Sequence, residues 1–395
     1  MISPLILITG ATGQVGSATL FQLLSQGYRV RAAVRSESKK DLLLGNNLCR
    51  AKHQSGRLQF VVVPDITAEG AYDEAMIGAR AVIHCASPQA YGKNVVAKGE
   101  LEEYYVRPAV RGTLNILKAA ANAGSVRRVV MTSSLAAIVP QLRLSGRVRP
   151  INRVYEAHDR VLANPGPYAT DIDAYVASKI SALRASETWM EENRPAFDAV
   201  YLHPGFVLGR NNVPGVNASR AMKGSNSLIV HLLSGTILGP HAGTTVLVDD
   251  VARVHVEALG IDYYGTPSKF VPAGSYILSQ PAVWSDAVYM ANRIFPGAFS
   301  VTEPQEGDAT MPTVEVRLDT GKTTRVFGDK FGTFVYQAMV VAAQYLELAR
   351  SKEWERLRET GRARVRERLA EQKRQEEGIL EDPLTVPEDS TQTEY

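Results

Sequence analysis

The chain has 395 residues, of which 45% are hydrophobic and 22% charged, the balance of an ordinary globular protein with two domains or one elaborated domain. Its formal net charge is only +3 and it carries no basic stripe, so we expect no nucleic-acid partner. Two cysteines, Cys49 and Cys85, are too few for a disulfide framework or a metal site, and no apolar run approaches the length of a membrane span; we expect a cytoplasmic protein without metal or membrane span.

The N-terminal segment predicts a strand, a glycine-rich turn, a helix and a second strand. The run "LILI" at 5–8 is continuously apolar, as a parallel strand buried on both faces requires. The helix that follows carries apolar residues at helical spacing and is closed by Gly27, and "YRVRAAV" forms the second strand.

The same alternation of strand and helix continues to about residue 205. Further strands are predicted at 58–65, 80–87, 127–134 and 197–205, with helices at 71–78, at 104–124 and around Tyr175. Such alternation is typical of the α/β class with a doubly wound parallel sheet, the Rossmann fold. We expect this domain to span 1–208, with the strand and helix at 244–262 returning to it.

Beyond residue 208 the alternation weakens. The segment 206–227 is rich in Gly, Asn and Ser and predicts a loop, and residues from about 265 to 350 predict a small cap. We assign 209–350 to a smaller C-terminal substrate-binding cap. Residues 351–395 predict a charged helix and a disordered tail, and that helix is either solvated or a contact to a partner or second copy.

The glycine-rich turn predicts a dinucleotide site. "TGATGQVGS" places Gly10, Gly13 and Gly16 between the first strand and its helix. Backbone N–H groups at such a turn approach a pyrophosphate, whose charge is favoured at a helix N-terminus. We therefore predict cofactor binding by these three glycines and by their neighbours Thr12, Gln14 and Val15.

The end of the second strand favours NADP over NAD. An acidic residue there would bind the ribose hydroxyls of NAD, but the strand ends in Val34 and Arg35, with Lys39 and Lys40 close behind. A guanidinium can pair with a 2′-phosphate, so we predict that Arg35 and Lys40 contact NADP. The alternative is that Arg35 is an ordinary surface arginine.

The stretch "DAYVASKISA" places Tyr175 four residues before Lys179. On a helix these two side chains share one face. The pattern is compatible with a surface hydrogen bond or with a catalytic pair, in which the lysine ammonium lowers the pKa of the phenol.

Together these motifs resemble the extended short-chain dehydrogenases/reductases. The glycine motif, "YVASK" and the strand "VVMTSS" match that superfamily, and "GYRVRAAVRS", "VIHCASP", "HPGFVLG" and "VDDVARVHVEAL" resemble its dihydroflavonol-reductase-like branch, which includes fungal methylglyoxal and aldehyde reductases. The resemblance covers about residues 4–295. It implies that Tyr175 donates a proton, that Lys179 holds the nicotinamide ribose and that Ser134 orients the carbonyl, with Ser133 as the alternative serine.

Further cofactor contacts are implied by the same resemblance. The positions that match the family's adenine pair, the turn beside the cofactor and the turn against the nicotinamide are Asp65, Ile66, Ala86, Ser87, Pro88, Pro204, Gly205 and Val207. His84 and His203 end apolar strands, and we interpret both as structural histidines with satisfied hydrogen bonds.

The resulting expectation is an NADP-dependent oxidoreductase. It would reduce a small-molecule ketone or aldehyde to an alcohol, or run the reverse oxidation, as a monomer or a homodimer. The alternatives are an NAD-dependent sugar-nucleotide epimerase or dehydratase, and a non-catalytic redox-sensing regulator on the same fold. The branch usually has a proline where this chain has Arg210, near the region that shapes the substrate.

Overall fold

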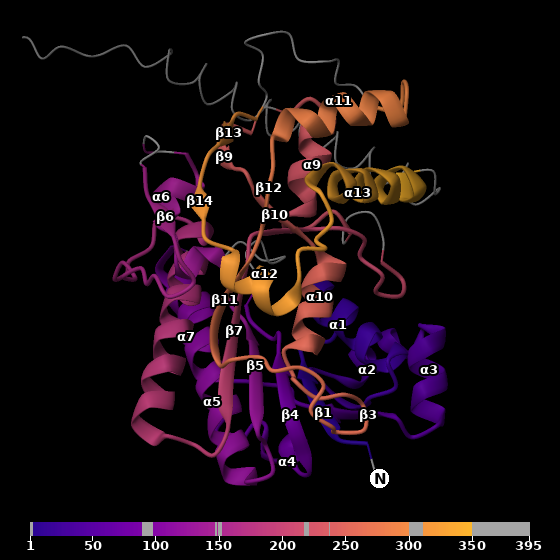
Figure 1. The fold of residues 1–395 in the computed structure, drawn as a ribbon, viewed down its shortest axis with the longest axis vertical. Coiled ribbons are helices and arrows are strands. Elements are labelled where there is room, and N and C mark those ends of the chain that lie inside the picture. The colour runs from indigo at the N-terminus through magenta and orange to yellow at the C-terminus, as the bar shows by residue number, and fades with distance from the viewer. Residues whose placement is uncertain are drawn as a thin grey trace, which may run out of the picture. The chain divides into compact units, whose positions relative to one another are not determined.

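The computed structural model describes residues 3–88, 98–146, 148, 152–216, 221–236, 238–299 and 311–349. Its centre is a seven-stranded parallel sheet in the order β11-β7-β5-β4-β1-β2-β3 (Figure 1). The strands are β1 (Leu5–Thr9), β2 (Arg29–Val34), β3 (Leu58–Val62), β4 (Ala79–His84), β5 (Arg128–Thr132), β7 (Asp198–Pro204) and β11 (Gly274–Leu278).

Helices cover both faces of this sheet. One face packs against α4 (Asp73–Met76), α5 (Arg107–Ala123) and α7 (Asp171–Asn193). The other packs against α1 (Gln14–Ser25), α2 (Glu37–Leu44), α3 (Asn47–Gln54), α10 (Val248–Glu257) and α12 (Gly321–Phe327). Side chains along β7 alternate between the two cores, Tyr201 in the first and Val200 and Leu202 in the second, so the middle of the strand, 199–202, is apolar on both faces. The predicted doubly wound fold is confirmed.

A second, three-stranded sheet was not predicted. β10 (Thr244–Leu247) pairs with β8 (Phe206–Leu208) and β12 (Gln280–Pro281). Of the strand and helix predicted to return at 244–262, only the helix α10 packs against the large sheet. The loop prediction for 206–227 was therefore wrong at its start, where β8 forms, and at its end, where α9 (Asn226–Leu233) begins. A three-residue strand is too short to show a two-residue hydrophobic period. Its pairing partner β10 also lies far away in the sequence, so local patterns do not reveal the pairing.

The region after residue 262 also contributes to the large sheet. β11 pairs in parallel with β7 and forms the edge strand, so the part of the chain that returns to the sheet extends beyond 262. A third apolar cluster joins α9, α11 (Trp284–Ile294) and α13 (Phe334–Ala349). The remaining short elements are η1 (Lys98–Glu100), η2 (Glu102–Val106), η3 (Leu135–Ala137), α6 (Gln141–Leu144), β6 (Val154–Tyr155), β9 (His241–Ala242), β13 (Thr313–Val314) and β14 (Arg317–Leu318).

The chain divides into two units at a point within α13. Residues Met1–Tyr345 form one compact unit and Leu346–Tyr395 another. The charged helix and tail predicted at 351–395 lie outside the described residues. Within the described part of the chain, we find no helix long and apolar enough to cross a membrane.

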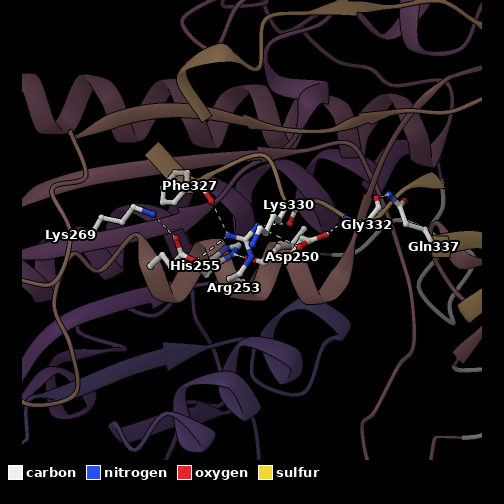
Figure 2. A network of polar contacts seen from close by, with 10 residues as sticks. Asp250, Arg253, His255, Lys269, Phe327, Lys330, Gly332 and Gln337 are labelled. Atoms are coloured by element: carbon white, nitrogen blue, oxygen red, sulfur yellow. Dashed lines mark hydrogen bonds and ion pairs between the residues drawn. The ribbon is translucent and has the colours of Figure 1, made fainter. Parts of the chain in front are cut away.

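A polar network ties α10 to the segment that leads into α13 (Figure 2). The Asp250 carboxylate accepts a hydrogen bond of 2.7 Å from the Gly332 backbone N–H. Arg253 donates to the carbonyls of Phe327 and Lys330 at 3.1 and 3.3 Å and pairs with Asp250. Asp250 is only 8% exposed, so its contacts are screened little by solvent. The network thus joins the large sheet's helix layer to the third cluster.

We predict that Asp250→Ala lowers the free energy of unfolding by about 1–3 kcal/mol, since it leaves the Gly332 N–H and part of Arg253 without an acceptor. The matched control is Asp249→Ala, which removes the same charge from the same helix terminus at an exposed position. Urea unfolding of both variants measures the difference. Equal losses would show that only the charge at the helix terminus matters.

Candidate active site

The glycine-rich turn packs directly against the end of β4. Gly10 has a φ of 70°, and a Cβ there would lie 2.7 Å from the backbone nitrogen of Ala86. A Cβ at Gly16 would lie 2.2 Å from the Gly10 carbonyl oxygen. Gly13 is the N-cap of α1, and no side chain caps that end. The turn therefore has the close packing and the exposed helix N-terminus that suit a dinucleotide pyrophosphate.

The neighbours of these glycines have structural contacts as well. The Gln14 side-chain amide donates to the Gly209 carbonyl at 3.0 Å, which links the glycine turn to the end of β8. Val15 is partly buried against the second core, and Thr12 is partly exposed. The predicted cofactor contacts of these three residues stay predictions.

Charged side chains gather where β2 and β3 end. Arg35 is exposed there, and together with Arg111 it lowers the pKa of Asp65, although hydrogen bonds from Thr67 lower it more. Lys40 forms an ion pair of 3.0 Å with Glu37 in its own helix, which competes with the predicted phosphate contact. Of the two predicted cations, Arg35 is the better placed for a 2′-phosphate.

The turn that contains Asp65 and Ile66 is held from α5. The Asn115 side chain donates to the carbonyls of Ile66 and Ala68 at 2.9 and 2.8 Å. Sequence analysis missed Asn115. Its only signal is an amide in a helix that is otherwise apolar on the buried side, which spacing alone does not connect to the turn.

The helix that carries Tyr175 and Lys179 begins with a capping box. The Thr170 hydroxyl accepts from the Asp173 N–H at 3.2 Å, and the Asp173 carboxylate accepts from the Thr170 N–H at 3.1 Å. Tyr175 and Lys179 share one face, with the lysine Nζ 5.4 Å from the phenol ring centroid. Lys179 also donates to the Ser87 hydroxyl at 3.0 Å. The fold thus brings Tyr175, Lys179 and Ser87 together from α7 and the end of β4.

Burial sets the pKa values of this pair. It raises the pKa of the Tyr175 phenol to about 12 and lowers the pKa of the Lys179 ammonium to about 8, while the Cys85 thiol acts on Lys179 in the opposite direction. The pKa of Tyr175 is thus raised where a lowered value was expected, and burial is the cause that acts on the phenol. At neutral pH Tyr175 therefore carries a proton to donate.

Two serines follow β5 and have different surroundings. Ser134 is partly exposed and is the N-cap of η3, where its hydroxyl accepts from the Ala136 N–H at 3.1 Å. The Ser133 hydroxyl oxygen is buried and has no hydrogen-bond partner. Both residues are partly exposed as a whole, so the choice of Ser134 over Ser133 for the substrate contact stays a prediction.

Three histidines lie at this edge of the sheet. His84 pairs with the Thr9 hydroxyl at 2.8 Å, and His255, which sequence analysis missed, pairs with the Thr132 hydroxyl at 2.7 Å. Burial lowers the pKa of each to about 4. His203 is fully buried with neither ring nitrogen hydrogen-bonded, so the prediction of a satisfied histidine is correct for His84 and wrong for His203. In the described residues no group of three or more His, Cys, Asp or Glu could hold a metal ion.

The turn after β7 packs tightly on the second sheet. A Cβ at Gly205 would lie 2.5 Å from the Thr244 carbonyl oxygen, and Val207 pairs with Val246 across the β8–β10 ladder. The Phe206 ring lies 6.2 Å from the His241 ring and 6.0 Å from the Trp284 ring. Pro204, Gly205 and Phe206 thus connect the large sheet to an aromatic cluster.

Comparison with known proteins gives consistent matches. A model of the NAD dependent epimerase/dehydratase family matches residues 6–262. The chain is 34% identical to "Ketoreductase CTB6" of Cercospora nicotianae over 89% of this chain and 98% of that protein, and 30% identical to "Aldehyde reductase 2" of Sporidiobolus salmonicolor over 80% and 91%. The yeast methylglyoxal/isovaleraldehyde reductase Gre2 complexed with NADPH has the same fold, with a TM-score of 0.72 and 24% identity over 87% of this chain and 98% of that one.

We predict that Gly16→Ala destabilises the protein by about 1–3 kcal/mol, because the new Cβ meets the Gly10 backbone, which cannot move aside. Gly112→Ala in α5 is the control, since its Cβ would meet only the flexible end of the Ile66 side chain, and alanine favours a helix by up to about 1 kcal/mol. Thermal unfolding checks both. Equal stability of the two variants would argue against a rigid glycine turn.

Proposed function

The chain belongs to the NAD dependent epimerase/dehydratase family, and on that premise we propose that it reduces a ketone or an aldehyde to an alcohol with NADPH, or catalyses the reverse oxidation. It is an oxidoreductase with a nicotinamide cofactor, as the ketoreductase and aldehyde reductase relatives support. The observation that carries the proposal is the cluster of Tyr175, Lys179 and Ser87 at the carboxyl edge of the sheet, beside the glycine turn.

Tyr175, Lys179 and Ser134 each have a proposed task. A bound nicotinamide would supply the hydride for the carbonyl carbon. Tyr175 donates its phenolic proton to the carbonyl oxygen, which becomes an alkoxide, a stronger base than a phenolate, as the hydride arrives. Ser134 donates a hydrogen bond to the same oxygen and orients it. Lys179 holds the nicotinamide ribose, and its charge stabilises the phenolate left after proton transfer.

The cofactor would lie along the carboxyl ends of the strands. Gly10, Gly13 and Gly16 would receive its pyrophosphate, for which the close packing of the turn leaves backbone N–H groups rather than side chains. Asp65 and Ile66 would contact the adenine, and Arg35 its 2′-phosphate. The absence of a carboxylate at the end of β2 supports NADP over NAD.

The substrate would lie between this edge and the smaller cap that we assign to residues 209–350. Phe206 is partly exposed there and packs on the fully buried ring of Trp284, which supports a largely apolar substrate.

We expect Tyr175→Phe to reduce kcat by roughly 100- to 10,000-fold, because the proton donor is lost while the ring packing remains. NADPH affinity should change little. Tyr104→Phe, at an exposed phenol in η2, is the matched control and should keep full activity. NADPH consumption across a panel of ketones and aldehydes measures both variants. Retained turnover in Tyr175→Phe would support a non-catalytic regulator, and sugar-nucleotide conversion without net NADPH consumption would support an epimerase.

We expect Arg35→Ser to weaken NADPH binding by about ten- to a hundred-fold and to leave NADH binding unchanged, because a hydrogen bond to a charged phosphate is lost. The effect should shrink at high salt, since Arg35 is exposed. Arg50→Ser in α3 removes an equally exposed cation away from this strand end and is the control. Fluorescence titration with both cofactors decides the point. Equal losses for NADH and NADPH would mean that Arg35 shapes the loop without contacting the phosphate.

A further inference from the structure

In the described part of the chain, the His203 ring and the Ser133 hydroxyl are among the buried side-chain polar groups without a hydrogen-bond partner, a set that also includes groups of Tyr72, Thr245, Asn292 and Gln337. His203 is 0% exposed and neither of its ring nitrogens has a hydrogen-bond partner, and the same is true of the buried Ser133 hydroxyl oxygen. The other two buried histidines at this edge, His84 and His255, each pair with a threonine hydroxyl. Buried polar groups are nearly always hydrogen-bonded in folded proteins, so this exception calls for a functional explanation.

The sheet register places these two residues side by side. Thr132 of β5 pairs with Leu202 of β7, and the Ser133 N–H continues that ladder with a 2.7 Å bond to the Leu202 carbonyl. Ser133 and His203 are the next residues on the two neighbouring strands. The Thr132 side chain bonds His255 on the α10 side, so alternation turns Ser133 to the α7 side.

His203 points to that same side. Its partner across the β7–β11 ladder is Ile277, and both Ile277 and Tyr201 lie in the core under α5 and α7. Residues paired across a ladder, and residues two apart on a strand, share a face. The imidazole therefore lies next to the Ser133 hydroxyl, and the turn that starts with Ser134 follows immediately.

The chemistry of the pair is complementary. Burial lowers the pKa of His203 to about 3, the Arg160 guanidinium lowers it as well, and the Ser134 backbone opposes this, which indicates that the Ser134 carbonyl lies close to the ring. A neutral imidazole has one N–H donor and one acceptor nitrogen. The Ser134 carbonyl already accepts from the Ala137 N–H at 3.0 Å and has a second lone pair available. The Ser133 hydroxyl can donate to the other ring nitrogen.

We propose that His203 is a positioning residue that bridges the Ser133 hydroxyl and the Ser134 carbonyl, and so holds the turn that presents the Ser134 hydroxyl to the substrate. This inference rests on the proposed catalytic role of Ser134. The two serines then have different roles. Ser134 contacts the carbonyl oxygen, and Ser133 stabilises the turn through its hydrogen bond to His203. Neither bond of the bridge has hydrogen-bond geometry in this structure, so the proposal requires a small shift of these side chains.

The test is a double-mutant cycle with His203→Leu, Ser133→Ala and the combined variant, each compared with the wild type. Each single variant should lower kcat about 10- to 100-fold, because a small displacement of an orienting group is costly, while NADPH affinity and KM change little. The combined variant should lose no more than the worse single variant, since both remove one bridge. Losses that multiply, or an unchanged kcat in the single variants, would overturn the proposal.

A conservative variant separates positioning from packing. His203→Asn keeps one donor and one acceptor and should recover part of the kcat lost in His203→Leu, whereas a packing role would leave the smaller asparagine worse. Cofactor titration and circular dichroism confirm that each variant is folded, and Ser133→Ala tests the bridge if His203→Leu does not fold. Ser134→Ala is the independent control: full activity in that variant would refute the catalytic serine, whatever the His203 variants do.

Discussion

The close approach of the glycine turn to the end of β4 is the constraint on which the site depends. Any side chain at Gly10 would overlap the backbone at Cys85 and Ala86, and any at Gly16 would overlap the Gly10 carbonyl. This contact brings the N-terminus of α1 against the carboxyl edge of the sheet. The residue after Ala86, Ser87, is the one that accepts a hydrogen bond from Lys179. One backbone contact thus places the proposed phosphate site and the proposed catalytic lysine on the same edge.

Burial then determines the chemistry available at that edge. Lys179 and Tyr175 are only partly exposed, and burial lowers the lysine pKa to about 8 and raises the phenol pKa to about 12, so at neutral pH the lysine keeps most of its charge and the phenol keeps its proton. A phenol kept protonated suits proton donation to a nascent alkoxide. The histidines nearby are neutral for the same reason, so they can orient other groups but cannot act as acids near neutral pH.

The second sheet connects this chemistry to the cap. β8 follows the Gly205 turn directly, and its end at Gly209 accepts hydrogen bonds from Gln14 in the glycine turn and from Asn226 at the start of α9. Asp250 and Arg253 of α10 make a second connection, to the segment before α13. Two polar links, one through Gly209 and one from α10, therefore hold the third apolar cluster beside the carboxyl edge.

The sequence by itself determined the doubly wound sheet, the glycine turn and the pairing of Tyr175 with Lys179, because each is a local pattern: buried apolar runs, glycines at fixed spacing, and side chains four apart on a helix. β8 and the edge strand β11 were decided by tertiary structure, since their runs are short and the strands that they pair with lie tens of residues away. The helix α9 is also short, and its packing against α11 and α13 is a tertiary contact. The same holds within the site. The pKa values of Tyr175 and Lys179 and the unpartnered imidazole of His203 depend on which groups the fold brings together and how far it excludes water. These two factors, the neighbours of a group and its burial, cannot be read from local sequence patterns.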